Sequence, residues 1–206
     1  PPERLQIIKK AIPVYGNSGP GFQFGRPIDL LENDPPTMWD FEIHRPFASW
    51  HVVGLFNWSE NGTTHTIDFG KLGLTGPIHL VDFWKNQYLG TYRKSFSTTL
   101  PPMSCQVLAV HKVKEHPMIV STTRHILQGA TETLESAWNA RSSTLSGTSH
   151  VIKGNPFEVM IFSGVRNPSD VRNALRLESS EQGILRFRIS GEYTSDIDWA
   201  VSFNPQ

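Results

Sequence analysis

The sequence predicts an all-β protein: an antiparallel β-sandwich of two stacked sandwich units, preceded by one N-terminal helix. Short strand-like segments separated by turn residues recur through most of the 206 residues, which is typical of antiparallel β proteins. One of them, Trp50–Ser59, is apolar on both side-chain parities over most of its length, as expected for a strand buried on both faces. With 38% hydrophobic and 11% aromatic residues, the chain has a globular composition.

The helix is predicted over Pro1–Ile12 and ends at Pro13. Glu3 lies near the positive helix end, and Lys9 and Lys10 lie near the negative end, so the charges suit the helix dipole. A helix this short is marginal by itself in water, so we expect it to dock on another surface. Its apolar stripe consists of Leu5, Ile7, Ile8, Ala11 and Ile12.

Strands of a first β unit are expected to follow a Gly/Pro-rich linker. Tyr88–Leu100 can form one strand or a bent pair, and turn residues separate the other segments. The remaining expected strands are Trp39–Ile43, Trp50–Ser59, Thr64–Phe69, His79–Trp84 and Cys105–Val113.

A second β unit is expected after His116-Pro117, with a short helix around Thr131–Ala137. The predicted domains are therefore residues 1–30 (a helix and a linker), 31–113 (a β-sandwich) and 114–206 (a second β-sandwich module). The expected strands of the second unit are Leu145–Ile152, Phe157–Phe162, Ala174–Leu177, Ile184–Ile189 and Trp199–Phe203.

Charge and composition argue against several function classes. Lys and Arg together number 19, as do Asp and Glu, so no overall field attracts nucleic acid, and we expect no nucleic-acid partner. No apolar stretch approaches the roughly 20 residues of a membrane helix, so no membrane span is expected. The glycine spacing fits neither a dinucleotide site nor a phosphate loop, and we expect no cofactor.

Four aspartates are candidate carboxylates for sugar hydrolysis, which needs two such groups across a pocket. Asp196 and Asp198 share a strand parity and could face one way, but we expect them to mark the turn that enters the last strand. Asp82 is expected to order a turn or to pair with a neighbour. Asp68 completes the set. We therefore assign no catalytic residue.

Metal and thiol chemistry are not expected either. The eight histidines lie at 44, 51, 65, 79, 111, 116, 125 and 150, without an HExxH motif or a close pair of ligands. The single cysteine, Cys105, allows no intramolecular disulfide and is expected to be a buried, inert thiol. Asn57 and Asn61 each begin an N-glycosylation acceptor pattern, which matters only in a eukaryotic secretory setting.

Several segments in order resemble the end of α-galactosidase (melibiase)-like glycoside hydrolases. Pro2–Pro13 resembles the last helix of their catalytic (β/α)₈ barrel, and Trp50–Ser59 resembles a strand of their C-terminal β domain. Met103-Ser104 stand where the family often has a histidine. The other matching segments are Arg26–Leu30, Leu72–Gly76, Asp82-Phe83-Trp84, Leu89-Gly90, Leu100-Pro101-Pro102 and Val107–Val110.

The resemblance implies a non-catalytic C-terminal β region beside a barrel that lies upstream in the same polypeptide. It also implies a periplasmic or secreted location. The family's catalytic aspartates belong to the barrel, and no position here matches their motifs, so the fragment itself is predicted to be inactive.

Two other functions stay open. The chain could be a carbohydrate-binding module, in which an exposed aromatic ring stacks on a sugar. Trp84 and Trp138, both flanked by polar residues, are the candidate rings, although core or inter-domain packing is the more common role of a tryptophan in a β-sandwich. The chain could also be a structural or protein-interaction β-module.

Overall fold

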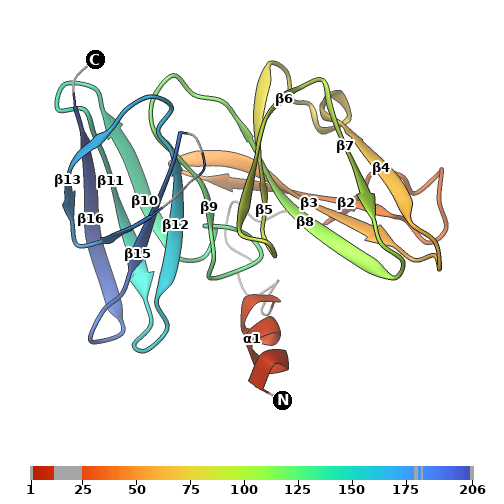
Figure 1. Ribbon diagram of the computed structural model, residues 1–206, viewed down its shortest axis with the longest axis horizontal. Coiled ribbons are helices and arrows are strands. Elements are labelled where there is room, and N and C mark those ends of the chain that lie inside the picture. The colour runs from red at the N-terminus through yellow and green to blue at the C-terminus, as the bar shows by residue number, and fades with distance from the viewer. Residues whose placement is uncertain (1, 12–24, 179–180, 182, 205–206) are drawn as a thin grey trace. The chain divides into compact units, whose positions relative to one another are not determined.

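The computed structural model describes residues 2–11, 25–178, 181 and 183–204. Strand accounts for 56% of the described residues and helix for 7%, which confirms an all-β protein with antiparallel sheets and an N-terminal helix. Helix α1 spans Pro2–Ala11 (Figure 1), and the predicted ends at Pro1 and Ile12 lie outside the described residues. Three apolar side chains of α1, those of Leu5, Ile7 and Ile8, are 50–53% exposed. No described helix has the length and apolarity to cross a membrane.

The chain divides into two compact units. The middle unit contains the chain from Gly25 to His44 and Ser49–Val113, and the C-terminal unit contains α1, Arg45–Ala48 and the chain from Lys114 onward. The domain ranges predicted from the sequence, 1–30, 31–113 and 114–206, stay a prediction.

The middle unit holds a six-stranded sheet in the order β1-β2-β3-β8-β5-β6 and a two-stranded sheet of β4 and β7. The predicted Tyr88–Leu100 segment forms a bent pair, which breaks at Lys94, where φ is 69°. The elements of the unit are β1 (Arg26–Pro27), β2 (Met38–Arg45), β3 (Ala48–Asn57), β4 (Thr63–Asp68), the 3₁₀ helix η1 (Phe69–Leu72), β5 (Pro77–Asp82), β6 (Gln87–Arg93), β7 (Ser95–Leu100) and β8 (Ser104–Lys112).

The core of the middle unit lies between these two sheets. Leu55 on β3 and Leu108 on β8 pack with Ile67 on β4 and Phe96 on β7, and η1 adds Phe69. Strand β3 is buried at six of its ten positions, on both side-chain parities, as the sequence predicts for a strand with both parities apolar. The preceding strand, β2, carries a buried carboxylate. Asp40 is only 2% exposed because it contacts both Arg26 and His51, each at 2.9 Å.

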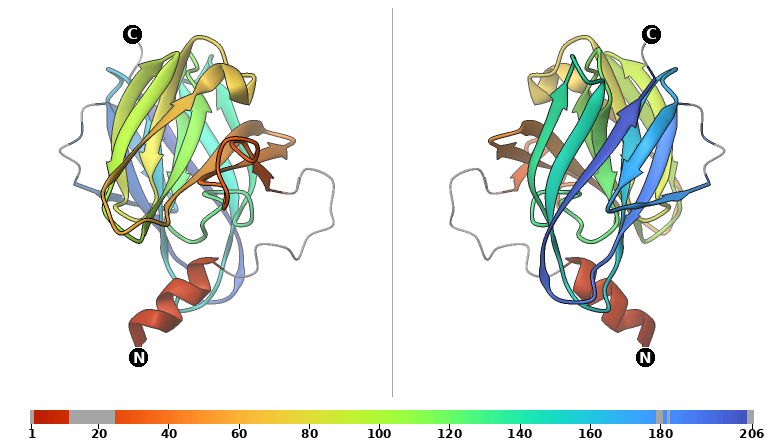
Figure 2. Two further views of the ribbon diagram at one scale, coloured as in Figure 1. Left: turned by 90° about the vertical axis from the view of Figure 1, so that its right-hand side faces the viewer. Right: turned by 90° about the vertical axis from the view of Figure 1, so that its left-hand side faces the viewer.

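The C-terminal unit is a sandwich of two four-stranded sheets, ordered β10-β11-β16-β13 and β14-β15-β12-β9 (Figures 1 and 2). The predicted helix at Thr131–Ala137 is wrong, because these residues run into strand β10, which pairs with β11. The strands are β9 (Met118–Thr122), β10 (Thr133–Asn139), β11 (Thr144–Val151), β12 (Phe157–Phe162), β13 (Pro168–Arg172), β14 (Leu175–Leu177), β15 (Ile184–Ile189) and β16 (Ser195–Phe203).

Alternate residues of facing strands build the core of the C-terminal unit. Leu145, Trp199 and Val201 of one sheet pack with Val159 and Phe187 of the other, all at most 2% exposed. Successive strand residues point to opposite faces, so the residues that alternate with this core lie on the opposite face of the β10-β11-β16-β13 sheet. That face carries the groove described below.

Candidate functional site

The two tryptophans proposed from the sequence lie in different units. Trp84 follows β5 in the middle unit, is 38% exposed and meets Phe83 edge-on at 4.9 Å between ring centroids. Trp138 lies on β10 in the C-terminal unit, where its ring stacks on His116 at 5.7 Å and packs against the core. The two rings therefore do not form one shared platform within either unit. A sugar-stacking role for either ring stays a prediction.

Two of the four aspartates considered as acid–base groups order turns. Asp82 is 1% exposed and accepts hydrogen bonds from the Lys85 backbone amide at 3.0 Å and from Gln106 Nε2 at 2.7 Å. This confirms the expectation that Asp82 orders a turn and pairs with a neighbour. Asp68 caps η1 by accepting from the Gly70 amide at 2.8 Å. After η1, Gly73 adopts φ 72°, a left-handed conformation that glycine reaches without steric cost.

The prediction that Asp196 and Asp198 mark a turn is wrong. Strand β16 already begins at Ser195, so both lie inside it, where they share a face as their parity predicts. Each has its own partner on β11. His150 Nδ1 lies 2.6 Å from Asp196 Oδ1, and Thr148 Oγ1 donates to Asp198 Oδ1 at 2.7 Å. The two carboxylates are thus neighbours along one strand and do not face each other across a pocket.

Several histidines make local contacts. Among the described residues, no group of three His, Cys, Asp or Glu side chains could hold a metal ion. His79 Nδ1 lies 2.8 Å from Tyr88 Oη, and burial lowers the pKa of His79 to about 4. Cys105 is exposed, which corrects the expectation of a buried thiol. Partial desolvation and the nearby Asp82 carboxylate nevertheless raise the pKa of the Cys105 thiol, so it is a poorer nucleophile at neutral pH.

The two glycosylation acceptor patterns differ in accessibility. Asn57 is 3% exposed, and its Nδ2 donates to the backbone carbonyls of Asn61, Leu100 and Pro101 at 2.7–3.2 Å. Its amide therefore ties the end of β3 to the end of β7 and is not available for a glycan. Asn61 is exposed.

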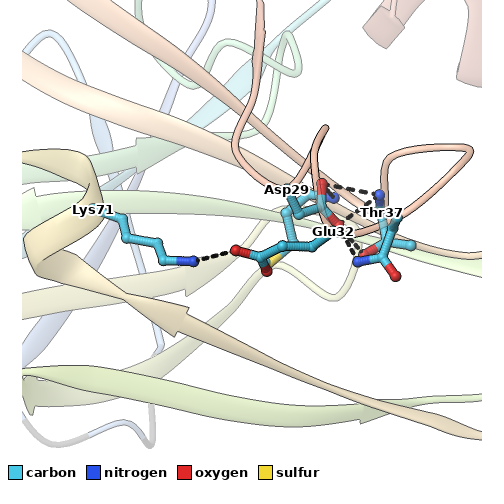
Figure 3. Close-up of polar contacts among 6 residues, drawn as sticks. Asp29, Glu32, Thr37 and Lys71 are labelled. Atoms are coloured by element: carbon cyan, nitrogen blue, oxygen red, sulfur yellow. Dashed lines mark hydrogen bonds and ion pairs between the residues drawn. The ribbon is translucent and has the colours of Figure 1, made fainter.

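A buried carboxylate organises the loop between β1 and β2. Asp29, fully buried, accepts hydrogen bonds from the Thr37 amide and hydroxyl, the Met38 amide and Asn33 Nδ2, at 2.6–3.1 Å (Figure 3). Burial by itself raises the pKa of the Asp29 carboxyl, but these hydrogen bonds outweigh it, so the pKa lies below its usual value. The nearby Glu32–Lys71 ion pair, 3.0 Å long, is exposed. Asp29 is therefore a structural group, because the hydrogen bonds of its own loop occupy its carboxylate oxygens.

A groove of about 610 Å³ lies in the C-terminal unit. Its floor is the β10-β11-β16-β13 sheet, and the turn between β2 and β3 contributes Pro46 and Phe47. Cross-strand pairing brings Glu135, Thr148 and Asp198 into one row on the face opposite the core. The described residues that line the groove are Pro46, Phe47, Leu134, Glu135, Ser136, Ala137, Ser146, Gly147, Thr148, Arg172, Asp198 and Trp199.

A second row, Ala137, Ser146 and Ala200, runs beside the first and ends at Arg172 on β13. Its side chains are short, so the sheet is recessed between the charged groups of Glu135 and Arg172. Chemically, the groove combines carboxylates and hydroxyls, which accept hydrogen bonds, with a guanidinium, which donates them. It can therefore hold a polar ligand.

Of the charged groups in this groove, the sequence brought only Asp198 into consideration, and it was expected to mark a turn. Glu135 was missed because residues 131–137 were expected to be helical, and Arg172 because no strand was expected over Pro168–Arg172. No sequence pattern pointed to Phe47 as a groove residue, since it lies in a short turn. The alternate positions Thr144, Ser146 and Thr148 could have indicated a polar face of β11. They could not have indicated which strands lie beside that face.

Comparison with known proteins concerns the middle unit above all. Residues 46–110 match the family model of the alpha galactosidase C-terminal beta sandwich domain. A search of curated proteins finds no match.

Among solved structures, similarity extends to a GH27 β-L-arabinopyranosidase from Geobacillus stearothermophilus, with 17% identity over 46% of this chain and 21% of that chain, at a TM-score of 0.40. Alpha-galactosidase I from Mortierella vinacea matches with 18% identity over 36% of this chain and 20% of that chain, at 0.31. An isomalto-dextranase of Arthrobacter globiformis T6, complexed with panose, matches with 15% identity over 81% of this chain and 32% of that chain, at 0.33.

The chain spans about a fifth of the GH27 β-L-arabinopyranosidase, where it covers 21% of the length. At such identities and TM-scores these structures carry no argument about chemistry. The family match confirms the resemblance that the ordered motifs predict. Residues 46–110 are thus similar to the alpha galactosidase C-terminal beta sandwich domain.

Proposed function

We propose that this chain is a non-catalytic C-terminal β region of an α-galactosidase-like glycoside hydrolase, and that it supports a catalytic barrel located upstream in the same polypeptide. The observation that carries the proposal is the family match over residues 46–110. The roles of the carboxylates in the middle unit support it. Asp29 and Asp82 are buried within hydrogen-bonded turns, and Asp68 caps η1, so each is committed to local structure.

The surface of helix α1 also supports the proposal. Leu5, Ile7 and Ile8 leave about half of their side-chain surface exposed on a helix of 10 residues. A short helix gains most of its stability by packing an apolar face, and this face suits docking on a larger body such as a barrel.

The direct test is an assay of the purified chain with 4-nitrophenyl α-D-galactopyranoside. We expect no hydrolysis above that of buffer. An Asp198→Asn variant purified in the same way distinguishes the chain's own activity from a contaminating hydrolase, because only the former could respond to the substitution. Hydrolysis by the chain that falls in this variant would contradict a non-catalytic role.

The supporting role is tested in the longer polypeptide that the upstream reading frame encodes. Asn57→Asp, which removes the amide donors from the three carbonyls around Asn57, is expected to lower the temperature of thermal inactivation while leaving kcat/KM at low temperature unchanged. An unchanged inactivation temperature, together with a destabilised middle unit, would argue against support of the barrel.

Carbohydrate binding is the second candidate function, favoured by the exposure of Trp84. Loss of glycan binding in Trp84→Ala but not in Trp138→Ala would assign binding to that ring. The family resemblance also leads us to propose a periplasmic or secreted location, which cell fractionation followed by immunoblotting tests.

A further inference from the structure

We infer that the groove of the C-terminal unit is a binding site for a neutral sugar residue, held between Asp198, Glu135 and Arg172. This inference goes beyond the proposed support of a barrel and does not depend on it. It also places sugar recognition away from both Trp84 and Trp138, neither of which lines the groove.

The size of the groove suits a small ligand. Its volume of about 610 Å³ lies within the roughly 300–1,000 Å³ typical of small-molecule sites. The room comes from short side chains in the floor. Ala137 pairs with Ser146 across β10 and β11, and Ser146 pairs with Ala200 on β16. A long side chain at either of the first two positions would fill the groove.

Asp198 is oriented for an acceptor role. Thr148 donates to Oδ1 at 2.7 Å, which fixes the carboxylate and leaves Oδ2 without a partner among the described residues. The Asp198 backbone is held as well, because Asn173 Nδ2 donates to the Asp198 carbonyl at 2.7 Å. A preoriented carboxylate oxygen accepts a ligand hydroxyl without first losing the freedom of its own side chain.

Arg172 and Glu135 complete a set of donors and acceptors. Both are exposed, and within the described part of the chain neither side chain makes a hydrogen bond or an ion pair. The guanidinium only donates, and the two carboxylates only accept. A sugar hydroxyl does both, so adjacent hydroxyls of one sugar ring can satisfy groups of both kinds.

The charge and the turn residues select among polar ligands. Two carboxylates and one guanidinium give the lining a net negative charge, which disfavours anionic ligands such as uronic acids or phosphates. Pro46 and Phe47 supply apolar surface, which suits the C–H groups of a sugar ring and not a bare cation. A neutral sugar is the ligand class that uses all of these groups.

The experiment is a glycan array probed with the 206-residue chain, followed by calorimetric titration with the strongest neutral ligand. Asp198→Ala and Arg172→Ala are each expected to weaken binding by about tenfold or more, as expected for the loss of hydrogen bonds to charged groups. The matched controls are Asp196→Ala, two residues along the same strand and outside the groove, and Arg176→Ala, an exposed arginine on β14. Both controls should keep the affinity within about twofold.

Unfolding curves show whether each variant is folded. If Asp198→Ala fails to fold, Arg172→Ala still tests the groove, because Arg172 lies at an exposed position. The inference is overturned if no neutral glycan binds at concentrations up to about 10 mM. It is also overturned if the groove variants and their controls lose affinity equally, if Trp84→Ala alone abolishes binding, or if only anionic glycans bind. None of these outcomes bears on whether the chain supports a barrel.

Discussion

At the scale of single residues, this protein uses charged and polar side chains mainly to fix its own loops. Asp29 is the clearest case, because one buried carboxylate receives hydrogen bonds from three residues of the same loop. Asn57 does the same with carbonyls at the ends of neighbouring strands. Neither role is visible in the sequence, where both residues look like ordinary turn or acceptor positions.

Asp29→Asn is expected to lower the free energy of unfolding by about 2–3 kcal/mol, because an amide cannot accept from all the donors that the carboxylate satisfies. Urea unfolding monitored by tryptophan fluorescence measures the loss. Glu32→Gln is the matched control. It removes a carboxylate from the same loop, but from an exposed ion pair, and should leave stability within experimental error.

The pH dependence of this loss has a definite sign. The folded-state pKa of Asp29 lies below its usual value, so its contribution is present above the unfolded pKa of about 3.9 and disappears as the pH falls through the lower folded value. The difference between wild type and Asp29→Asn should therefore be constant from about pH 5 to 8 and shrink below about pH 4. A difference that persists at the lowest pH would contradict the assignment.

At the scale of elements, the packing of β11 against β16 depends on one small residue. Gly147 pairs with Trp199, and the indole lies directly over it. A Cβ at this position would come within 2.5 Å of Trp199 Cζ2 and within 2.7 Å of the Glu135 carbonyl oxygen. The second of these contacts is to the backbone of the paired strand β10, which cannot move away without disturbing the strand pairing. Glycine is therefore required here by close approach.

Gly147→Ala is expected to destabilise the C-terminal unit by about 1–3 kcal/mol, the usual cost of overpacking. Differential scanning calorimetry or urea unfolding measures it. Gly62→Ala is the control, because a Cβ there meets nothing closer than 3.7 Å. Equal stability of the two variants would mean that Trp199 can move away from Gly147 at no cost.

At the scale of the whole molecule, buried histidines are expected to limit stability in acid. Burial lowers the pKa of His79 to about 4 from a usual value of 6.5. Between these values the unfolded chain binds a proton that the folded chain does not, so stability falls as the pH drops from about 6.5 to 4. Burial also lowers the pKa of His65, although the charge of Asp29 opposes this, so His65 adds in the same direction.

His79→Gln is expected to reduce the slope of the unfolding free energy against pH in this window. The reduction corresponds to about one proton, or roughly 1.4 kcal/mol per pH unit. Free energies of unfolding measured from pH 4 to 7 give the slope, whatever the variant's stability at pH 7. His44→Gln serves as the control for removing a histidine from a less buried strand position. An acid slope that His79→Gln leaves unchanged would show that another group is responsible.

Local sequence signals predict much of this organisation. The turn residues and apolar runs predicted the all-β class, strand β3 with both faces buried, and the N-terminal helix, because hydrophobic period and turn chemistry act over a few residues. The ordered motifs also indicated the domain type that residues 46–110 match. Local signals failed where they were weak, as in Thr133–Asn139, which pairing with β11 holds in a strand.

The groove, in contrast, was decided only by the tertiary structure. Its charged groups come from β10, β16 and β13, and register across strands brings them to one face. Register is set by long-range packing of the opposite, apolar face, and a slip of one residue would turn all of these side chains away. The sequence alone could therefore name Asp198 as a candidate, but only folding places it beside Thr148 and in one groove with Glu135 and Arg172.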